Sequence, residues 1–409
     1  MIHLYLFDEE GRASTYGIGT YIRNVISVCV RLPFIITVVR LKVQGDFLIT
    51  VSENGVRSIN IPILREIEGD EKKEDRKKNC QEVVSILKPY ISNTDSLIFH
   101  LNYTQDYFLA DTLKTEWPDN KVVLTVHYFT WCFALYGNYS YLAHIINKEG
   151  IGLSDFEKEV IYSGLFEQQL FKITDKIICL SQFAQEILQD YYDIPLEKTI
   201  FIPNGLPDKY QEKDSNLIRQ LYHIPPEEKM ILFVGRLDRI KGVSYLIEAF
   251  KEVIKEIPEA HLYLIGDGRF ADYISLCNPC WNQITFCGKL QPEQVFDFYR
   301  MSNLGMLPSM HEQCSYVAIE MMMHGLPFIG STSTGLDEMI EEGINGYNVH
   351  LQEDGPFVKI PIADFSTLMI KMLKLKSLKK ISFNNRKLYL QKYTNIKMGN
   401  KLKCLYSSL

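Results

Sequence analysis

Residues 308–330 read Pro-Ser-Met-His-Glu-Gln-Cys-Ser-Tyr-Val-Ala-Ile-Glu-Met-Met-Met-His-Gly-Leu-Pro-Phe-Ile-Gly. An apolar strand precedes this segment, a helical run fills its middle, and the Gly-Leu-Pro at 325–327 ends the helix before another short strand. Glu312 therefore lies on the loop that enters a helix, and Glu320 lies about two turns further along. The unpaired N–H groups and positive dipole end of such a helix suit a diphosphate, and the two carboxylates suit sugar hydroxyls. A nucleotide-sugar combines all of these groups.

The spacing of Glu312 and Glu320 resembles a signature of the retaining glycosyltransferases related to glycogen synthase, sucrose synthase and bacterial polysaccharide mannosyl- and glucosyltransferases (glycosyl transferases group one). In that family the motif follows a Pro-Ser strand end and closes on a Gly-Leu-Pro turn, as it does here. The resemblance implies the GT-B fold: two Rossmann-like, doubly wound α/β domains that face each other across a cleft, with a C-terminal helix that crosses back to the first domain.

The rest of the chain shows the matching alternation of strands and helices. Predicted strands cover 3–7, 96–100, 122–127 and 176–180 in the first half, and 230–235, 261–265, 284–288 and 304–308 in the second. We predict an acceptor-side domain at 1–207, a nucleotide-sugar-binding domain at 208–370, and a basic helical tail at 371–409 that packs back on the first domain. One helix is expected to begin near Thr20 and another to be capped by Ser181. The charged run 65–79 is expected to form a solvated helix face or loop.

The composition fits a large enzyme with packed cores. The 409 residues, 46% of them hydrophobic and 23% charged, suffice for two or three domains. The N-terminus lacks the basic start of a secretory signal, and the longest apolar stretch, 25–39, is interrupted by Arg31 and Pro33 and is too short to span a membrane. Nine scattered cysteines indicate free thiols, and Cys277 and Cys280 lack the further ligands that a metal site needs. These features predict a cytoplasmic protein.

Two cations follow the first strand of the second predicted domain. Arg236 and Lys241 lie in the loop after Gly235, where a guanidinium binds phosphate oxygens through its fork and an ammonium binds them as a point charge. The alternative is two solvent-facing cations, but the Gly-Arg…Lys-Gly frame and the downstream glutamates favour phosphate binding. In the resembled family these positions hold the donor diphosphate, which implies an enzyme that requires no metal and no other cofactor.

Gly17 and Gly19 open a predicted helix after the first strand, and glycine there allows the backbone to approach a phosphate or an acceptor. A dinucleotide site would need a third glycine and an acidic residue about 20 positions further on. The predicted second strand, 34–39, contains no acid, which argues against a dehydrogenase. By resemblance, this loop faces the donor phosphates and the acceptor.

His127 ends the apolar strand 122–127. A lone histidine in such a place is more often structural than catalytic. By resemblance it contacts the donor sugar and stabilises the developing positive charge. His127, Arg236, Lys241 and Glu312 are therefore the predicted catalytic residues.

Resemblance also implies that Glu312 hydrogen-bonds the transferred sugar and that Glu320 hydrogen-bonds the ribose of the nucleotide. The family's usual Glu-Gly-Phe-Gly is Glu-Gln-Cys-Ser here, without either glycine. We expect the backbone amides of Cys314, Ser315 and Tyr316 to meet the phosphate. Because the side chains of this loop reshape the sugar pocket, the identity of the donor sugar does not carry over from the family.

The implied reaction is transfer of a sugar, with retention, from a nucleotide-sugar to a saccharide or lipid-linked acceptor during synthesis of a surface polysaccharide or glycoconjugate. The sequence offers no carboxylate nucleophile of the kind that retaining glycosidases use. The family's proposed solution is front-face attack, with the leaving phosphate taking the acceptor's proton. Two alternatives stay open: an inactive homologue that serves as a binding subunit, and a nucleotide-sugar 2-epimerase, which shares the fold but lacks this frame of cations and glutamates.

Charge divides unevenly along the chain. Residues 371–409 contain 11 Lys/Arg and no Asp/Glu, whereas residues 1–370 contain 33 Lys/Arg against 50 Asp/Glu. Five apolar positions in the tail approximate a helical stripe: Tyr389, Tyr393, Ile396, Leu402 and Tyr406. One interpretation is a terminal helix that covers the first domain, and the other adds peripheral contact with anionic lipid at the inner face of the membrane. An acidic body without a stacking motif argues against nucleic acid as a partner.

Overall fold

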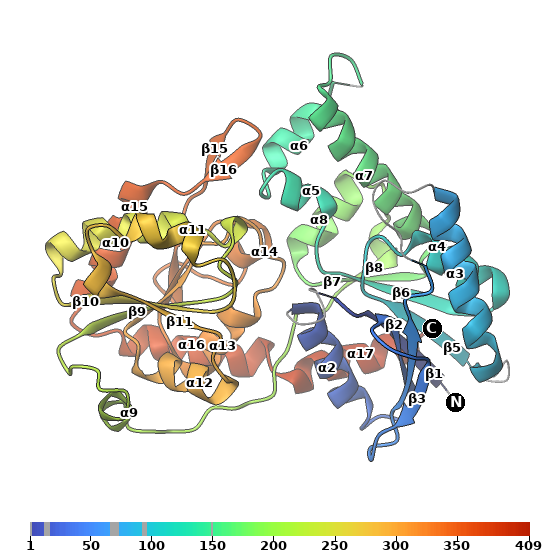
Figure 1. Ribbon diagram of the computed structural model, residues 1–409, viewed down its shortest axis with the longest axis horizontal. Coiled ribbons are helices and arrows are strands. Elements are labelled where there is room, and N and C mark those ends of the chain that lie inside the picture. Colours follow the sequence, from blue (N-terminus) through green and yellow to red (C-terminus); the bar gives the residue numbers. More distant parts are fainter. Residues whose placement is uncertain (1, 12–16, 66–72, 92–95, 149) are drawn as a thin grey trace. The chain divides into compact units, whose positions relative to one another are not determined.

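The computed structural model describes residues 2–11, 17–65, 73–91, 96–148 and 150–409. The chain forms two compact units (Figure 1). Unit 1 comprises Met1–Thr130, Ser154–Gly205 and Asn395–Leu409, and unit 2 comprises Trp131–Leu153 and Leu206–Thr394. Two segments thus group differently from the predicted domains: residues 131–153, within the predicted first domain, and residues 371–394, within the predicted tail, both belong to unit 2.

Unit 1 is built on an eight-stranded sheet in the order β3-β4-β2-β1-β5-β6-β7-β8. Neighbouring strands are parallel except for the β3–β4 pair. The strands are β1 (Ile2–Glu9), β2 (Phe34–Val43), β3 (Leu48–Val51), β4 (Arg57–Pro62), β5 (Ser96–Leu101), β6 (Lys121–Val126), β7 (Lys176–Cys179) and β8 (Thr199–Phe201). Their centres are near-continuous apolar runs, as expected of parallel strands covered on both faces.

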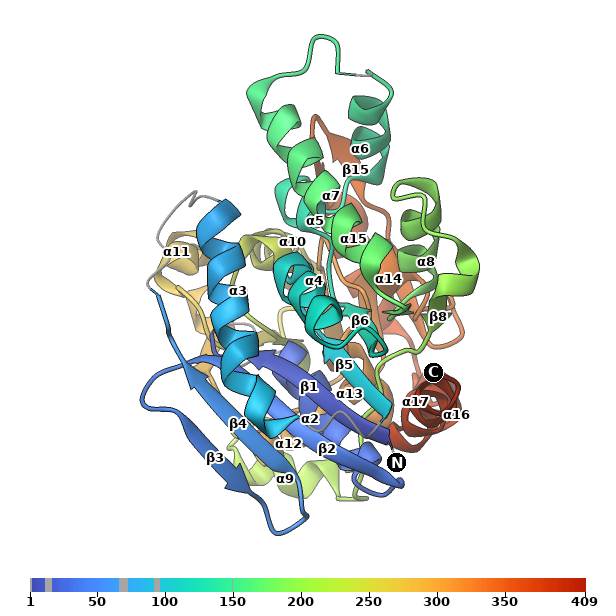
Figure 2. The ribbon, with the colours of Figure 1, turned by 90° about the vertical axis from the view of Figure 1, so that its right-hand side faces the viewer.

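Helices cover both faces of this sheet, as Figure 2 shows for unit 1. They are α2 (Gly17–Cys29), α3 (Lys73–Leu87), α4 (Tyr107–Glu116), α7 (Asp155–Ile173), α8 (Gln182–Asp190) and α17 (Asn395–Ser407). The chain leaves β1 toward β2 through α2 and leaves β5 toward β6 through α4, in opposite directions along the sheet. Right-handed crossovers therefore place α2 and α4 on opposite faces. The last helix, α17, packs against α2 and returns the C-terminus to unit 1.

Unit 2 contains a six-stranded parallel sheet in the order β11-β10-β9-β12-β13-β14. Its strands are β9 (Lys229–Val234), β10 (Ala260–Ile265), β11 (Ile284–Gly288), β12 (Leu304–Leu307), β13 (Phe328–Ser331) and β14 (Gly346–Val349). The main helices are α10 (Val243–Glu256), α12 (Pro292–Met301), α13 (Tyr316–His324), α15 (Ile362–Lys374) and α16 (Lys379–Lys392). A hydrophobic core, with Phe233, Phe250 and Phe365 fully buried, joins α10 and α15 to the sheet.

Smaller elements complete unit 2. They are α5 (Thr130–Ala134), α6 (Tyr139–Ile146), α9 (Ser215–Leu221), α11 (Ala271–Ile274), α14 (Thr334–Asp337) and the hairpin of β15 (Gln352–Asp354) and β16 (Phe357–Lys359). The turn before α6 is bonded to the hairpin, because the Asn138 amide donates to the carbonyl oxygens of Gly355 and Phe357. These contacts account for the grouping of residues 131–153 with unit 2.

The expected strands are present, with small shifts at their ends. The helix expected near Thr20 begins at Gly17, and Ser181 caps α8 by accepting a hydrogen bond from the Ala184 amide. Of the charged run 65–79, residues 73–79 belong to α3, and residues 66–72 lie outside the described part of the chain.

The predicted stripe of the tail is divided between two helices, because α16 ends at Lys392 and α17 begins at Asn395. Tyr389, Tyr393, Leu402 and Tyr406 are buried as the stripe predicted, but Ile396 is 64% exposed. Within the described residues, no helix has the length and apolar character that crossing a membrane requires.

Candidate active site

The carboxyl edge of the unit 2 sheet brings two loops together. One follows β9 and leads into α10, and the other follows β12 and leads into α13. Since β9 and β12 are neighbours in parallel register, with Phe233 opposite Met306, their loops emerge side by side. The edge of a parallel sheet at such a place is where α/β proteins commonly bind ligands.

Direct backbone contact holds the two loops against each other. The Met310 amide donates to the Ile240 carbonyl oxygen over 2.7 Å. Gly242, which precedes α10, has φ +69°, and a Cβ placed there would lie 1.9 Å from the carbonyl oxygen of Pro308. Only glycine fits both the left-handed conformation and this approach. The glycine of the predicted Lys-Gly pair therefore has a packing role.

Glu312 lies at the centre of the resulting network. Its carboxylate accepts from Lys241 Nζ at 2.5 Å and from Ser309 Oγ at 3.0 Å. The backbone of Glu312 is fixed from β13's side, because its amide donates to Thr334 Oγ1 at 3.0 Å and its carbonyl oxygen accepts from the same hydroxyl. The side chains of Lys241 and Glu312 are 21% and 14% exposed, so this ion pair is largely withdrawn from water.

Arg236 is tied to the same loop through Asp238. Its Nη2 lies 3.1 Å from Asp238 Oδ2, while Asp238 Oδ1 accepts from the Lys241 amide at 3.2 Å. One carboxylate thereby orients both the guanidinium and the backbone that carries the ammonium. Gly235, directly after β9, has φ +155°, and its amide donates to the Ile265 carbonyl oxygen at 2.9 Å.

Glu320 occupies a separate place on α13. Its Oε2 accepts from the buried Tyr299 hydroxyl at 2.7 Å, and burial raises the pKa of the Glu320 carboxyl to about 7. At the start of the helix, Ser315 is the N-cap and its hydroxyl accepts from the Ala318 amide at 3.4 Å. Cys314, Ser315 and Tyr316 thus surround the N-terminus of α13, as the sequence predicted, between the two glutamates along the chain.

In unit 1, His127 follows the last residue of β6. Its Nε2 lies 3.1 Å from Asn102 Oδ1, and the amide nitrogen of Asn102 donates to the Phe7 carbonyl oxygen at 2.9 Å. Because the second bond fixes the amide, Asn102 presents an acceptor to the ring, and His127 carries its proton on Nε2. Burial, with a smaller effect from His100, lowers the pKa of His127 to about 3, so the imidazole is neutral near pH 7.

The neighbouring His100 differs in having both ring nitrogens occupied. Its Nε2 lies 2.7 Å from Thr125 Oγ1, and its Nδ1 lies 2.7 Å from the Tyr406 hydroxyl of α17. Such a fully bonded, buried histidine holds the C-terminal helix to the sheet and is structural.

The predicted glycines of unit 1 lie at the start of α2. Gly17 is exposed, and a Cβ placed there would meet no atom of the described residues within 4 Å; Gly19 is buried. The residues that precede them, 12–16, lie outside the described part of the chain. Gly17, Gly19 and His127 are in unit 1, whereas the other predicted site residues are in unit 2.

Sequence reasoning missed the residues that hold the predicted ones in place. Ser309 lies three positions before Glu312 in the same motif, so their proximity could be inferred from the sequence, whereas Thr334 lies 22 positions after Glu312. Tyr299 and Asn102 come from other elements, and no spacing in the sequence points to them. Among the described residues, no group of three or more His, Cys, Asp or Glu side chains is arranged to hold a metal ion.

Solved structures of other proteins share this architecture. Sucrose-phosphate synthase from Thermosynechococcus elongatus has a TM-score of 0.79 at 18% identity, over 100% of this chain and 99% of that one. The Anabaena HepE protein in complex with UDP and glucose has a TM-score of 0.71 at 15% identity, over 100% of both chains. The protein therefore has the GT-B fold that the sequence predicted.

Similarity in sequence is concentrated in part of the chain. The lipopolysaccharide 1,2-N-acetylglucosaminetransferase of Salmonella typhimurium is 28% identical over 200 residues, which are 46% of this chain and 51% of that protein. The chain spans about half the length of the curated relatives it matches. The family model described as Glycosyl transferases group 1 matches residues 228–359. This segment, which carries both predicted cations and both predicted glutamates of unit 2, therefore belongs to the glycosyl transferases group 1 family.

Proposed function

We propose that the protein is a retaining, metal-independent glycosyltransferase, which moves a sugar from a nucleotide-sugar to a saccharide or lipid-linked acceptor in the synthesis of a surface polysaccharide or glycoconjugate. The observation that carries the proposal is the contact of Lys241 with Glu312. The two loops that carry these residues approach closely because Gly242 has no side chain. A cation for the diphosphate and a carboxylate for the sugar are thereby side by side, as the two halves of a sugar diphosphate are.

In this proposal the diphosphate is bound without a divalent cation. Arg236 offers a planar fork, Lys241 a point charge, and the N-terminus of α13 adds backbone N–H groups. Together they stabilise the charge that grows on the leaving phosphate oxygen as its bond to the sugar breaks. Donor binding would draw Lys241 toward phosphate and release Glu312 for the sugar hydroxyls.

Transfer with retention then follows as a front-face reaction. The bond from the anomeric carbon to the phosphate oxygen breaks, a bond from that carbon to the acceptor oxygen forms on the same face, and the acceptor proton passes to the leaving phosphate. The neutral ring of His127 would lie against the donor sugar and stabilise positive charge at the anomeric carbon through its Nδ1 lone pair. Glu320 would receive the ribose hydroxyls in exchange for its bond with Tyr299.

A panel of nucleotide-sugars in the presence of EDTA tests the donor site. UDP-glucose is the first probe, because the Anabaena protein of the same fold was solved with UDP and glucose. We expect one donor to raise the melting temperature of the wild type and to lose that effect in Glu320→Ala. Stabilisation that appears only when Mg²⁺ is added would contradict metal independence, and an inverted anomeric configuration in the product, read by NMR, would contradict retention.

The second candidate is an inactive homologue that serves as a binding subunit. It is favoured by the loop after Glu312, where Gln313 and Ser315 stand in place of the two glycines of the resembled family, and by the closed contact of Lys241 with Glu312. Donor binding without release of nucleotide in the presence of any acceptor would support it. Conversion of the donor to its C2 epimer would instead reveal the 2-epimerase of the same fold.

We also propose peripheral contact with anionic lipid, through α16. On this helix Phe383 is 68% and Leu390 46% exposed, with Lys380 and Lys387 on the same side at helical spacing. Co-sedimentation with vesicles of neutral lipid, or of neutral lipid with phosphatidylserine, is the test. We expect binding to the anionic vesicles only, lost in Lys380→Glu/Lys387→Glu; equal binding to both vesicles would contradict the proposal.

A further inference from the structure

The short segment 127–130 connects β6 to α5 and carries His127. Its first three residues belong to no helix or strand, so no regular ladder of backbone hydrogen bonds sets their conformation. The chain also leaves unit 1 directly after Thr130 and returns to it at Ser154. His127 therefore lies three residues from a point at which the chain passes from one unit to the other, and its position depends on the side chains that hold the segment.

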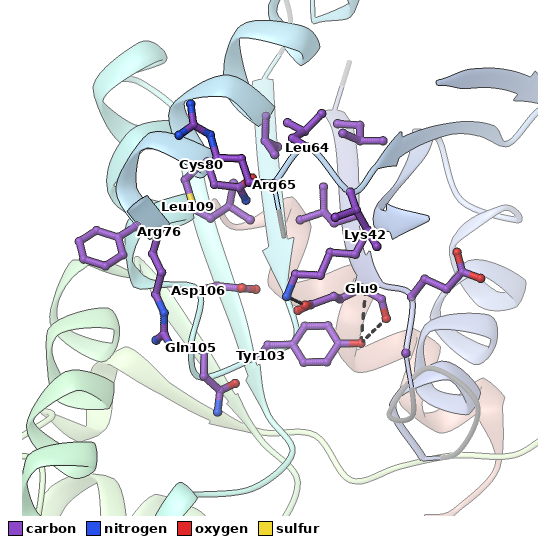
Figure 3. A pocket seen from close by; sticks show the side chains of 18 of the residues that line it. Glu9, Lys42, Leu64, Arg65, Arg76, Cys80, Tyr103, Gln105, Asp106 and Leu109 are labelled. Atoms are coloured by element: carbon purple, nitrogen blue, oxygen red, sulfur yellow. Dashed lines mark hydrogen bonds and ion pairs between the residues drawn. The ribbon is translucent and has the colours of Figure 1, made fainter. Parts of the chain in front are cut away.

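Tyr128 holds the segment on its exposed side. Its hydroxyl donates to Gln105 Oε1 at 2.9 Å. Both residues line a cavity of about 800 Å³ at the ends of β1, β2 and β4, and Figure 3 shows Gln105 and Asp106 on its wall. The Asp106 carboxylate faces this cavity and has no hydrogen bond or ion pair with any described residue. Because the contact of Tyr128 with Gln105 is exposed, water competes for it, and it fixes the segment only weakly.

Thr130 is held on the buried side, by Glu167 from α7. Glu167 Oε1 accepts from the Thr130 amide at 2.8 Å and from the Thr130 hydroxyl at 2.5 Å. The amide of the residue that begins a helix has no carbonyl partner within that helix, so the carboxylate satisfies a group that α5 leaves unpaired. Glu167 is 2% exposed, and both bonds are therefore protected from water.

The second oxygen of the same carboxylate serves a different contact. Glu167 Oε2 accepts from the Tyr192 hydroxyl at 2.5 Å. The buried Tyr192 ring stacks on Phe129, with centroids 5.6 Å apart, and packs edge-to-face with Phe171 at 4.8 Å. Oε2 thus joins Glu167 to the aromatic core, whereas Oε1 holds the backbone of the segment.

A carboxylate is an expensive choice for this place. Burial raises the pKa of the Glu167 carboxyl, while the hydrogen bonds from Thr130 and Tyr192 lower it. A buried carboxylate is tolerated only when its oxygens are hydrogen-bonded, and an apolar side chain of similar size would fill the same space at lower cost. The carboxylate therefore indicates that acceptors are needed here, above all for the Thr130 amide.

We propose that Glu167 is a positioning residue for His127, because it fixes Thr130 where the chain leaves unit 1 and so fixes the backbone from which the imidazole projects. The inference rests on the proposed glycosyl transfer, in which His127 stabilises charge at the anomeric carbon. The ring itself is oriented by Asn102, 3.1 Å from its Nε2, and by the Tyr21 ring, whose centroid lies 4.7 Å from that of the imidazole. Glu167 adds the restraint on the main chain that these two contacts do not supply.

NMR of the full-length protein with ¹³C-labelled histidine tests the position of the ring without any substrate. The His127 signal is identified by its absence from His127→Gln. In the wild type the pKa of His127 is lowered by burial to about 3, so its signal should not titrate between pH 5 and pH 8. In Glu167→Ala the released segment admits water to the ring, and the signal should be displaced and titrate nearer the ordinary pKa of about 6.5.

Two matched variants separate the oxygens of the carboxylate. Glu167→Gln keeps an oxygen that accepts from Thr130, and Tyr192→Phe removes only the bond to Oε2. We expect the His127 signal of both variants to match the wild type, although Tyr192→Phe should lower the melting temperature. A His127 signal displaced equally in Tyr192→Phe and Glu167→Ala would assign Glu167 to the core and overturn the inference.

Release of UDP from UDP-glucose gives the kinetic readout. We expect Glu167→Ala to lower kcat by about 10-fold and to change KM by less than about 2-fold, because the residues proposed to hold the donor diphosphate are in unit 2. The double variant Glu167→Ala/His127→Gln should be no slower than His127→Gln alone, since Glu167 acts through His127. Losses that multiply in the double variant would overturn the inference.

The pair Thr130→Val and Thr130→Ser keeps the test decisive if Glu167→Ala does not fold. Valine removes the hydroxyl donor at nearly constant shape, and kcat should fall by about 3-fold, whereas serine keeps the donor and the rate. Equal rates and equal His127 signals in the two variants would overturn the inference. If the wild type releases no nucleotide from any donor, the proposed function fails, while the NMR comparison still decides whether Glu167 positions the ring.

Discussion

The glycines next to the helix that follows the first strand of each unit's sheet differ sharply in their surroundings. In unit 2 Gly242 precedes α10, and its missing side chain leaves room for the carbonyl oxygen of Pro308. In unit 1 Gly17 begins α2, and an added Cβ there would meet no atom of the described residues within 4 Å. A glycine at this place therefore carries a packing constraint in unit 2, whereas the described residues of unit 1 impose none.

Charged groups follow the same division. In unit 2 Glu312 is bonded to Lys241 and Glu320 to Tyr299, so both glutamates have protein partners before any ligand arrives. In unit 1 Asp106 faces the cavity without such a partner among the described residues. A ligand at the edge of unit 2 must exchange partners with an existing network, whereas a ligand in the cavity of unit 1 fills a space. The first arrangement favours preorganised electrostatics, and the second favours variation in the molecule bound.

Alanine at the two glycines should produce the largest difference between the units. Gly242→Ala would force a Cβ against backbone at a left-handed residue, and we expect it to lower the free energy of unfolding by about 3 kcal/mol or more. Gly17→Ala should change it by less than about 0.5 kcal/mol. Urea denaturation of both variants measures the difference. Similar losses of unfolding free energy in the two variants would show that Gly242 and Gly17 do not differ in how tightly they are packed.

Removal of the charge on Glu312 should come next in size. Glu312→Gln keeps the shape of the side chain but cannot pair with Lys241, and we expect kcat/KM to fall about 100-fold, equivalent to about 2.7 kcal/mol of transition-state stabilisation. Ser309→Ala removes only the neutral hydrogen bond to the same carboxylate and should cost about 10-fold or less. Comparable values of kcat/KM for the wild type and Glu312→Gln would show that the contacts around Glu312 do not contribute to transition-state stabilisation as proposed.

Sequence reasoning was most successful where the chemistry is local. The segment with Glu312 and Glu320 predicted the strand, loop and helix that hold them, because turn residues and apolar runs act over a few positions. The cap of α8 by Ser181 follows from the same kind of local signal.

Partners that come from other strands or helices were not predictable. Tyr299 reaches Glu320 from α12, Thr334 reaches Glu312 from beyond β13, and Asn102 reaches His127 from the adjacent strand end. Each depends on the register and order of the sheet, which a single sequence does not specify residue by residue. The grouping of residues 131–153 with unit 2 is of the same kind, since it depends on hydrogen bonds of Asn138 with a hairpin about 200 positions later.

The pH dependence of stability compares a buried carboxyl group that has a hydrogen-bond partner, Glu320 in unit 2, with one that has none among the described residues, Asp106 in unit 1. Glu320 has a folded pKa of about 7, above its ordinary 4.5, because burial disfavours the carboxylate. The contribution of Glu320 to the free energy of unfolding is therefore fully present below pH 4.5 and is lost as the pH rises through about 7. Between pH 5 and pH 8 the unfolding free energy of the wild type should fall relative to that of Glu320→Gln by on the order of 2 kcal/mol.

Asp106→Asn provides the counterpart in unit 1, since the Asp106 pKa is also about 7 and is raised by burial. We expect its effect to have the same sign and the same pH window. Urea denaturation of the wild type and the two variants at pH 5, 6, 7 and 8 gives the three curves. A wild-type curve that rises relative to either variant would show that the carboxyl concerned is stabilised as an anion in the fold.

The smallest effect should separate the two histidines of unit 1. His100→Gln leaves Thr125 or Tyr406 without its ring partner, so stability should fall by about 1–2 kcal/mol. His127→Gln can still donate an amide hydrogen to Asn102, so stability should change little, but the lone pair on Nδ1 is lost and kcat should fall by about 10-fold. Denaturation curves and initial rates on the same preparations distinguish the two patterns. If His127→Gln lost stability and kept its rate, the histidine after β6 would be a structural residue like its neighbour, and the chemistry would lie with the paired charges of unit 2.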